Sequence, residues 1–352
     1  MISAVLRPPL GLALAFALLV MWMAAPPVAA QSALPKILVI GTGGTISGVQ
    51  PEPGTLGSYN DHKQVNQLVS ALPVIAKYAQ VESEEFLNIG SNEITIENWL
   101  NLARRINKVI TERKDLSGIV VTHGTATLTQ TAFFLYLTIK SDMPVVILGA
   151  QRPSTGISAD GPLNLLSAIR VAASPDARGK GVLVVMDERI MSARDTQKYY
   201  GRSGGFDTGE MGMLGVVNSR SIEFFYAPTR RHAAQVEFDL SSVKTFPRVD
   251  LEYGFVGSGK RAKTDARAIV VATTLFTPDE NAYFTSLQKQ GVIVATTFPS
   301  GDNVSSAGGG SSDGPRLISI QRMTPIHARI LMMVALTKTQ DPEEIQRIFN
   351  EY

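Results

Sequence analysis

Six short apolar runs recur along the chain, each rich in valine and isoleucine and bounded by turn residues. They lie at 37–40, 118–121, 145–148, 182–185, 268–271 and 292–295. None alternates polar with apolar residues, so each predicts a strand that is covered on both faces. Helical patterns separate several of these runs, and strand, helix, strand in succession indicates a parallel sheet. We therefore expect an α/β protein.

Two helices are well defined by the pattern. The segment 98–110 places apolar side chains on one face at a spacing of three to four residues: Trp99, Leu102, Ala103, Ile106 and Ile110. Thr95 is the predicted N-cap of this helix. A second helix is predicted to begin at Asp341, because Pro342 and two glutamates follow in the first turn.

The first thirty residues differ from the rest. Arg7 is their only charged residue, an apolar stretch runs from about Leu10 to Met23, and small residues end at Ala30. This pattern predicts a secretory signal peptide over 1–30, and hence a periplasmic or secreted protein that has no membrane segment after cleavage. A retained membrane anchor is the alternative, although the apolar stretch is short for a bilayer span.

The chain of 352 residues is long enough for two domains. We expect an N-terminal domain over 35–227, a linker over 228–253 that holds two prolines and scattered charges, and a smaller C-terminal domain over 254–352. The segment 300–315 is dominated by glycine and serine, which predicts a surface loop.

The composition of the chain limits the classes of partner and cofactor that we expect. The formal net charge is +2, which gives no strong attraction to nucleic acid or to an anionic membrane. The chain has no cysteine, so no disulfide stabilises it, and its four histidines show no metal-ligand spacing. We expect no metal and no organic cofactor.

The segment 37–48, "ILVIGTGGTISG", is the sharpest local motif. An apolar strand runs into a turn that contains Gly43 and Gly44 and ends at Thr45. Glycines let the backbone turn tightly and approach a ligand closely, and ligands bind at the carboxyl ends of parallel strands. The dinucleotide fingerprint fails, because its sixth position holds Ile46. A purely structural turn is the alternative.

A second strand followed by a turn spans 118–131, "GIVVTHGTATLTQT". His123 is either a general base or a buried histidine bonded to the backbone, and we favour the second interpretation. Lys198 follows a further strand, close to Arg194 and Asp195. In a desolvated cleft this lysine would lose its proton readily, whereas on the surface it would be an ordinary solvated charge.

Taken together and in this order, these motifs resemble those of the bacterial L-asparaginase/glutaminase family, exported type. The resemblance covers nearly all of the chain after the signal peptide. The matching segments are "TGGTIS" at 42–47, "NIGS" at 88–91, "HGTAT" at 123–127, "RPST" and "SADGPLNL" within 152–165, "RDTQK" at 194–198 and "DPEEIQRIFNEY" at 341–352. The resemblance implies a flavodoxin-like parallel sheet in the N-terminal domain and a smaller α/β C-terminal domain. It also implies a homotetramer, built as a dimer of dimers, that acts on a small-molecule amide.

The resemblance also implies site residues. Thr45 would be the nucleophile that attacks the side-chain amide, with Thr125 as the second threonine and Lys198 keeping it activated. Tyr59 would be the loop tyrosine near the first threonine, although it stands one residue later than ungapped alignment places the family's tyrosine. Substrate-binding residues would be Gly44, Ser91, Asn92 and the residue at position 126. Backbone amides after the glycine turn would form an oxyanion hole.

This chain departs from the family pattern at Ala126, where the family has an aspartate that binds the substrate's α-ammonium and completes a Thr-Lys-Asp triad. The C-terminal domain also lacks the family's Gly-Asn-Gly turn and loop glutamate, and Asp302 is the acidic residue nearby. Three hypotheses follow. The chain is an amidohydrolase whose substrate lacks a free α-ammonium, a ligand-binding pseudoenzyme, or an ordinary L-asparaginase/glutaminase.

Overall fold

A computed structural model describes residues 33–52, 54, 59–258, 264–301 and 317–352. The predicted signal peptide at 1–30, Asp302 and nearly all of the predicted loop at 300–315 lie outside these ranges. Pro35–Tyr352 forms one compact unit. Within the described ranges, every helix is too short or too polar to cross a bilayer.

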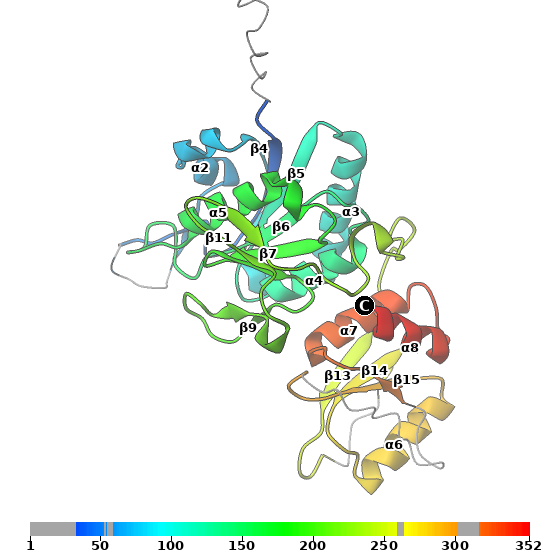
Figure 1. Ribbon diagram of the computed structural model, residues 1–352. Helices are drawn as coiled ribbons and strands as arrows, with labels where there is room; N and C mark the ends of the chain where they lie inside the picture. Colours follow the sequence, from blue (N-terminus) through cyan, green and yellow to red (C-terminus); the bar gives the residue numbers. More distant parts are fainter. Residues whose placement is uncertain (1–32, 53, 55–58, 259–263, 302–316) are drawn as a thin grey trace, which may run out of the picture. The chain divides into compact units, whose positions relative to one another are not determined.

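The larger sheet has eight strands in the order β12-β11-β8-β7-β6-β5-β1-β4 (Figure 1). In chain order its strands are β1 (Lys36–Gly43), β4 (Gln80–Ile89), β5 (Leu116–Thr122), β6 (Val145–Leu148), β7 (Val182–Met186), β8 (Arg189–Ser192), β11 (Gly215–Val217) and β12 (Ile222–Phe224). Two short hairpins accompany it: β2 (Gly48–Val49) with β3 (Asp61–His62), and β9 (Gln197–Lys198) with β10 (Phe206–Asp207).

The five strands β4-β1-β5-β6-β7 are parallel, and β8, β11 and β12 extend the sheet in antiparallel fashion. Numbered along the chain, the parallel strands have the order 2-1-3-4-5, which is the flavodoxin order, so the predicted fold class is confirmed. The connections from β1 and from β4 run in opposite directions along the sheet. The carboxyl ends of β1 and β5 therefore flank the switch point, where such sheets bind ligands.

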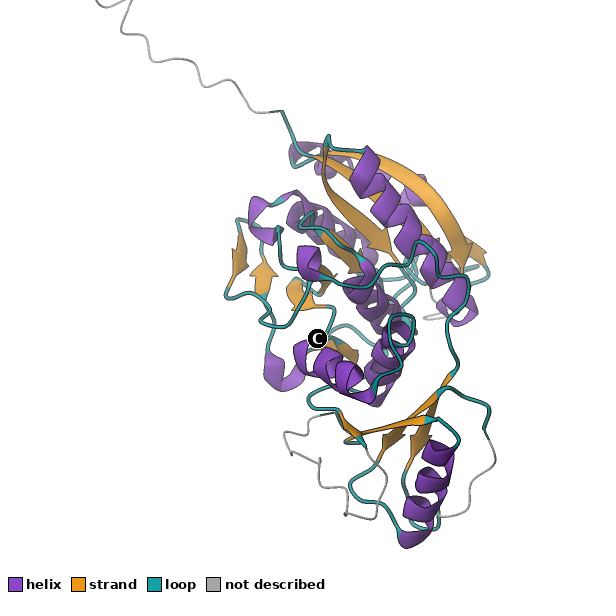
Figure 2. Ribbon diagram, turned by 90° about the vertical axis from the view of Figure 1, so that its right-hand side faces the viewer, coloured by secondary structure: helices purple, strands orange, loops and turns teal. Residues whose placement is uncertain are grey.

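Helices cover both faces of this sheet (Figure 2). The helices are α2 (Val65–Ser70), α3 (Ile96–Glu112), α4 (Leu128–Thr138) and α5 (Gly161–Ala173). Helices α3 and α4 pack on each other, with the rings of Trp99 and Phe134 stacked at 5.4 Å. Helices α2 and α5 share a pocket lined by Leu68 and Leu165, which Ile46 of the first glycine turn also lines.

The second sheet is smaller and has four parallel strands in the order β13-β14-β15-β16. Its elements are β13 (Val249–Tyr253), β14 (Ala268–Ala272), α6 (Pro278–Lys289), β15 (Ile293–Thr297), β16 (Ile318–Ser319), α7 (Pro325–Ala335) and α8 (Pro342–Glu351). Short 3-10 turns complete the fold: η1 (Pro73–Lys77), η2 (Ser91–Glu93), η3 (Pro175–Ala177), η4 (Gly209–Met211) and η5 (Ala233–Gln235). Helix α7 contacts α4, where the ring of Phe133 stacks on His327 at 4.4 Å.

All six predicted strands are present, and both predicted N-caps are confirmed. The Thr95 side chain accepts from the Asn98 amide, and the Asp341 side chain accepts from the Glu343 amide. The last five residues of the predicted linker form β13, an edge strand of the second sheet. Strand β4 has no apolar run because it is an edge strand with exposed polar side chains.

Candidate active site

The turn after β1 has a backbone that only glycine adopts easily. Gly43 and Gly44 have φ of 90° and 85°, in the left-handed region. A Cβ on Gly43 would lie 2.5 Å from the backbone nitrogen of Ile89 in β4. The turn then closes with hydrogen bonds from the Ser47 and Gly48 amides to the Gly44 and Thr45 carbonyls. Thr45 is thus left half-buried at the end of the strand.

Tyr59 reaches Thr45, although it stands one residue later than ungapped alignment places the family's tyrosine. Its Oη lies 3.3 Å from Thr45 Oγ1. The tyrosine precedes β3, and the hairpin of β2 and β3 brings it back over the glycine turn. Its ring covers Gly48, because a Cβ on that glycine would lie 2.6 Å from the Tyr59 Cγ. The glycine at position 48 therefore makes room for the tyrosine.

The turn after β5 carries Thr125, whose hydroxyl accepts a hydrogen bond from Lys198 Nζ at 2.8 Å. The Thr125 hydroxyl in turn donates to Gln151 Oε1 at 3.5 Å. Burial lowers the pKa of Lys198 below its ordinary value, because desolvation disfavours the ammonium. Among the residues that the structure describes, Lys198 forms no salt bridge, and the residue beside Thr125 is the exposed Ala126.

His123 is buried in the core, so the favoured interpretation of this histidine is confirmed. Its Nδ1 lies 2.8 Å from the Gly124 carbonyl, which can only accept, so Nδ1 carries a proton. Burial lowers the pKa of His123 to about 4, which keeps the ring neutral and makes Nε2 an acceptor. The Thr131 hydroxyl therefore donates to Nε2 at 2.9 Å and accepts from Trp99 Nε1 at 2.8 Å.

The two threonine turns touch through glycine backbone. A Cβ on Gly44 would lie 2.2 Å from the Cα of Gly124, and one on Gly124 would lie 2.7 Å from the Ser91 side chain. Ser91 begins η2, and its hydroxyl accepts from the Ala126 amide at 3.2 Å. The structure therefore brings the first turn, the second turn and the "NIGS" segment together at the switch point between β1 and β5.

The "SADGPLNL" segment holds the turn after β6. The Asp160 carboxylate accepts from the Gln151 and Arg152 amides at 2.8 and 2.9 Å. Asn164 donates to the Gly149 carbonyl at 3.0 Å. These bonds fix the backbone of the turn from which Gln151 reaches Thr125. The segment therefore positions Gln151 beside the candidate site.

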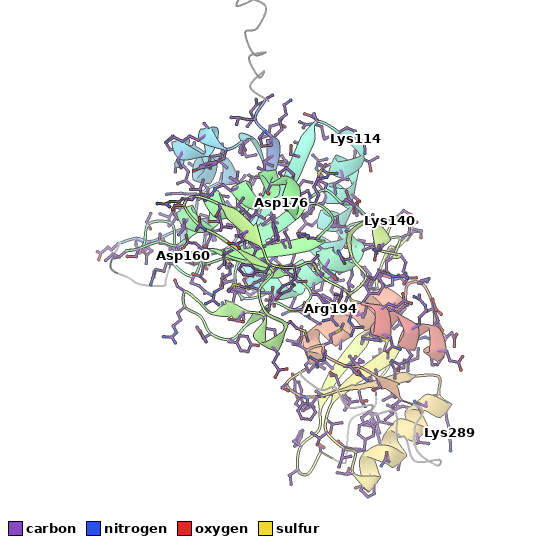
Figure 3. All side chains as sticks on the ribbon, in the orientation of Figure 1. Lys114, Lys140, Asp160, Asp176, Arg194 and Lys289 are labelled. Atoms are coloured by element: carbon purple, nitrogen blue, oxygen red, sulfur yellow. The ribbon has the colours of Figure 1, made fainter. Side chains whose placement is uncertain are left out.

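The "RDTQK" segment has a similar supporting role. Arg194 is buried; it donates to the main-chain oxygen of Tyr352, to the Asp195 carboxylate at 2.5 Å and to the Arg322 carbonyl at 3.3 Å. Figure 3 labels Arg194 and Asp160, which anchor these two supporting segments. The hairpin of β9 and β10 then presents Lys198, whose Nζ lies 5.8 Å from the centroid of the Phe206 ring.

Of the predicted site residues, Gly44, Thr45 and Tyr59 meet at the first turn, and Thr125, Lys198, Ala126 and Ser91 meet at the second. Asn92 is exposed on η2, with its amide oxygen directed toward Gly90. Sequence reasoning missed Gln151 beside Thr125, and it missed the contact of His62 with Ser47 beneath Tyr59. The sequence pattern assigns His62 no role, because the histidines show no metal-ligand spacing. Across the described residues, no group of three or more His, Asp and Glu side chains could hold a metal ion.

Comparison with known families matches this chain twice: residues 36–230 to "Asparaginase, N-terminal" and residues 249–349 to "Glutaminase/Asparaginase C-terminal domain". The chain belongs to the asparaginase family. It is 40% identical over 329 residues to L-asparaginase 2 of Bacillus subtilis, covering 91% of this chain and 87% of that protein. It is 38% identical over 344 residues to the glutaminase-asparaginase of Pseudomonas fluorescens, covering 93% and 95%.

A solved structure agrees with this assignment. The probable cytoplasmic L-asparaginase of Campylobacter jejuni superposes with a TM-score of 0.83 at 35% identity, covering 90% of this chain and 100% of that one. The matches to the asparaginase family therefore cover both sheets of the fold.

Proposed function

We propose that this asparaginase-family protein hydrolyses the side-chain amide of asparagine or glutamine, with Thr45 as the nucleophile. The observation that carries the proposal is the Lys198–Thr125 hydrogen bond of 2.8 Å, in a turn that touches the turn of Thr45. The names of the relatives support the ordinary asparaginase/glutaminase reaction over a substrate without an α-ammonium.

In the proposed reaction, Thr45 Oγ1 bonds to the amide carbon, and its proton passes by way of the neighbouring Tyr59 hydroxyl to the leaving nitrogen, which departs as ammonia. Water then attacks the ester, guided by Thr125. Neutral Lys198, favoured by its lowered pKa, takes up the proton that this step releases. The ester C–O bond to Thr45 then breaks, the proton held by Lys198 passes to the departing Thr45 oxygen, and the acid product leaves.

Substrate binding follows from the remaining groups. Because Ser91 Oγ accepts from the Ala126 amide, its own proton is available for the substrate's α-carboxylate. Asn92 lies beside Ser91 at the rim. Gly44 lets the substrate approach the backbone closely. The Ser47 and Gly48 amides are already paired, so the proposed oxyanion hole narrows to the amides of Thr45 and its successor.

Ala126 favours a second candidate function, hydrolysis of an amide that lacks a free α-ammonium. A methyl group stands where a carboxylate would pair with that cation, and burying an ammonium unpaired is costly. This candidate keeps the same nucleophile and the same second threonine, and it differs only in the substrate.

The deciding experiment is an ammonia-release assay on asparagine, glutamine and their des-amino analogues, with the Thr45→Ala variant as control. We expect turnover of asparagine or glutamine that disappears in the variant. Turnover of only the des-amino amides would support the second candidate. Saturable binding without turnover would overturn both and leave a ligand-binding pseudoenzyme.

Export is proposed from the apolar pattern of residues 1–30. A relative in Haemophilus influenzae, 31% identical over 336 residues, is named a probable periplasmic L-asparaginase. N-terminal sequencing of the protein from a periplasmic fraction should show cleavage after Ala30. An uncleaved chain in the cytoplasmic fraction would contradict export.

A homo-oligomer, built as a dimer of dimers, is proposed from the family resemblance. Large apolar side chains lie exposed at the carboxyl edge of the second sheet, with Phe255 67% and Leu275 84% exposed. Exposed apolar patches of this kind commonly mark interfaces. Light scattering after size exclusion should give four chains, and Leu275→Glu should lower that number if this edge is buried.

A further inference from the structure

His62 lies next to Tyr59, whose hydroxyl is paired with Thr45. It is the register partner of Gly48 in the hairpin of β2 and β3. Its ring meets the Tyr59 ring edge-on, with centroids 5.2 Å apart and planes at 86°. Its Nδ1 lies 3.0 Å from Ser47 Oγ. One imidazole therefore contacts both the tyrosine and the glycine turn that carries the nucleophile.

The direction of the hydrogen bond follows from proton counting. Ser47 Oγ lies 2.8 Å from the Gly44 carbonyl oxygen, and two oxygens at that distance share a proton. That proton belongs to the serine, because a carbonyl can only accept. Ser47 Oγ must then accept from His62, so Nδ1 of His62 is protonated.

Tyr59 has two of its contacts fixed by this arrangement. Gly48 lies against the ring, and the His62 ring stands nearly perpendicular to it. Two backbone bonds close the hairpin on either side, from the Asn60 amide to the Val49 carbonyl and from the Lys63 amide to the Ser47 carbonyl. The tyrosine hydroxyl reaches Thr45 only while the ring keeps this place.

We propose that His62 is a positioning residue: its Nδ1–H bond to Ser47 and its ring contact with Tyr59 hold the Tyr59 hydroxyl at Thr45. The inference rests on the proposed function in one respect, that Thr45 is the nucleophile. The hydrogen bond of His62 goes to Ser47 and its ring packs on Tyr59, so it acts through Tyr59 and not as an acid or base.

Ammonia-release kinetics test this role with a double-mutant cycle. His62→Ala should lower kcat by about 10- to 100-fold, because a nucleophile whose partner is misplaced loses alignment. His62→Asn should retain kcat within about threefold, because its amide can donate where Nδ1 does. In the Tyr59→Phe background, His62→Ala should cost less than about twofold more.

An equal loss in the Tyr59→Phe background, or an unchanged kcat in His62→Ala at an unchanged melting temperature, would overturn the proposal. A lower melting temperature with normal kcat in the surviving folded protein would likewise show a purely structural role.

A second readout does not depend on activity. The chain has four histidines, so their ring nitrogens can be assigned by ¹⁵N NMR, with His62 identified by its absence in His62→Asn. At neutral pH we expect a protonated Nδ1 in His62 that is lost or shifted in Ser47→Ala. An unprotonated Nδ1 in the unaltered protein would overturn the inference. If the unaltered protein releases no ammonia, the proposed function fails while this measurement still decides the contact.

Discussion

The turn after β5 and the turn after β1 each carry one threonine of the candidate site, but they are held in different ways. The β5 turn is anchored by His123, which is fully buried and bonded through Thr131 to Trp99 of a neighbouring helix. The β1 turn is held by its own glycines and by a hairpin of two-residue strands. The core thus fixes the second threonine, whereas a peripheral hairpin places the partner of the first.

Because of this difference, substitutions at the two turns should have different costs in stability. Thr125 sits on a support that can change only by disturbing the core, although its partner Lys198 lies on the two-residue hairpin of β9 and β10. The tyrosine that meets Thr45 depends on a few contacts made by Ser47, Gly48 and His62, which can change at little cost to stability. Variants at the two turns should therefore separate stability from catalysis.

The largest expected effect is on the chemistry of the second turn. Lys198→Met removes the amine and keeps most of the volume, so kcat should fall by about 10²- to 10⁴-fold. Thr125→Val should cause a loss of similar size, and the double variant should lose little more, because the two groups act together. Steady-state ammonia release measures all three. Additive losses would show that the hydrogen bond seen at 2.8 Å has no catalytic meaning.

Much of the second turn could be predicted from sequence. An uninterrupted apolar run predicts β5. The threonine that follows it lies at the switch point, because the carboxyl ends of parallel strands lie at the same edge of the sheet. The favoured interpretation of His123 as a buried histidine bonded to the backbone is also confirmed. Four of the five parallel strands carry apolar runs that predict them, whereas the exposed edge strand β4 does not.

The first turn was harder to predict in full. The glycines identified the turn, but the contact of Tyr59 with Thr45 depends on strands of only two residues, which leave no periodic pattern. Gln151 reaches Thr125 from a turn that Asp160 holds, a contact between distant segments that local sequence does not show. The predicted domain limits at 227 and 254, and the cleavage at Ala30, remain predictions.

The next largest effect is expected from a substitution that breaks the contact between the two turns. Gly44→Ala introduces a Cβ 2.2 Å from the Cα of Gly124 at a φ of 85°, so both strain and overlap arise. We expect a loss of about 2–5 kcal/mol in the free energy of unfolding, together with nearly complete loss of activity. Chemical denaturation measures the first. Normal stability would mean that the turns separate freely.

A matched pair of variants compares the two supports directly. Thr131→Val leaves His123 Nε2 and Trp99 Nε1 buried without partners, which should cost about 2–4 kcal/mol. Ser47→Ala, on the peripheral side, should cost only about 1 kcal/mol. Urea titrations of both variants provide the test, and equal losses would contradict the proposed difference between the turns.

Acid should act on the buried support. The pKa of His123 is about 4 in the folded protein against an ordinary 6.5, and burial gives His327 the same value. The unfolded chain takes up these protons near pH 6.5 and the folded chain only near pH 4. The free energy of unfolding should therefore decrease as the pH is lowered from about 6.5 to about 4. The decrease should be about 1.4 kcal/mol per pH unit for each histidine.

Unfolding titrations at several pH values check this slope. In His123→Gln the slope should be about half as steep, because only one of the two buried histidines remains. A slope that the variant leaves unchanged would assign the acid sensitivity to other groups.

The smallest expected effect is a gain. Ala126→Asp places a carboxylate beside Thr125, where Lys198 has no salt bridge among the described residues. We expect kcat/KM for asparagine to rise by roughly tenfold, the scale of one charged hydrogen bond. Ala126→Asn is the control without charge. No gain from the aspartate would show that cleft groups elsewhere limit the reaction.

The glycine contact between the turns has a consequence for substrate range. The distance between the two threonines is set by main chain against main chain, so no side chain there can be enlarged or trimmed to suit another ligand. Adaptation to a new amide has to occur around this fixed pair, at positions such as 59, 126 and 151. Directed evolution of this scaffold would do best to vary those three positions and leave Gly44 and Gly124 untouched.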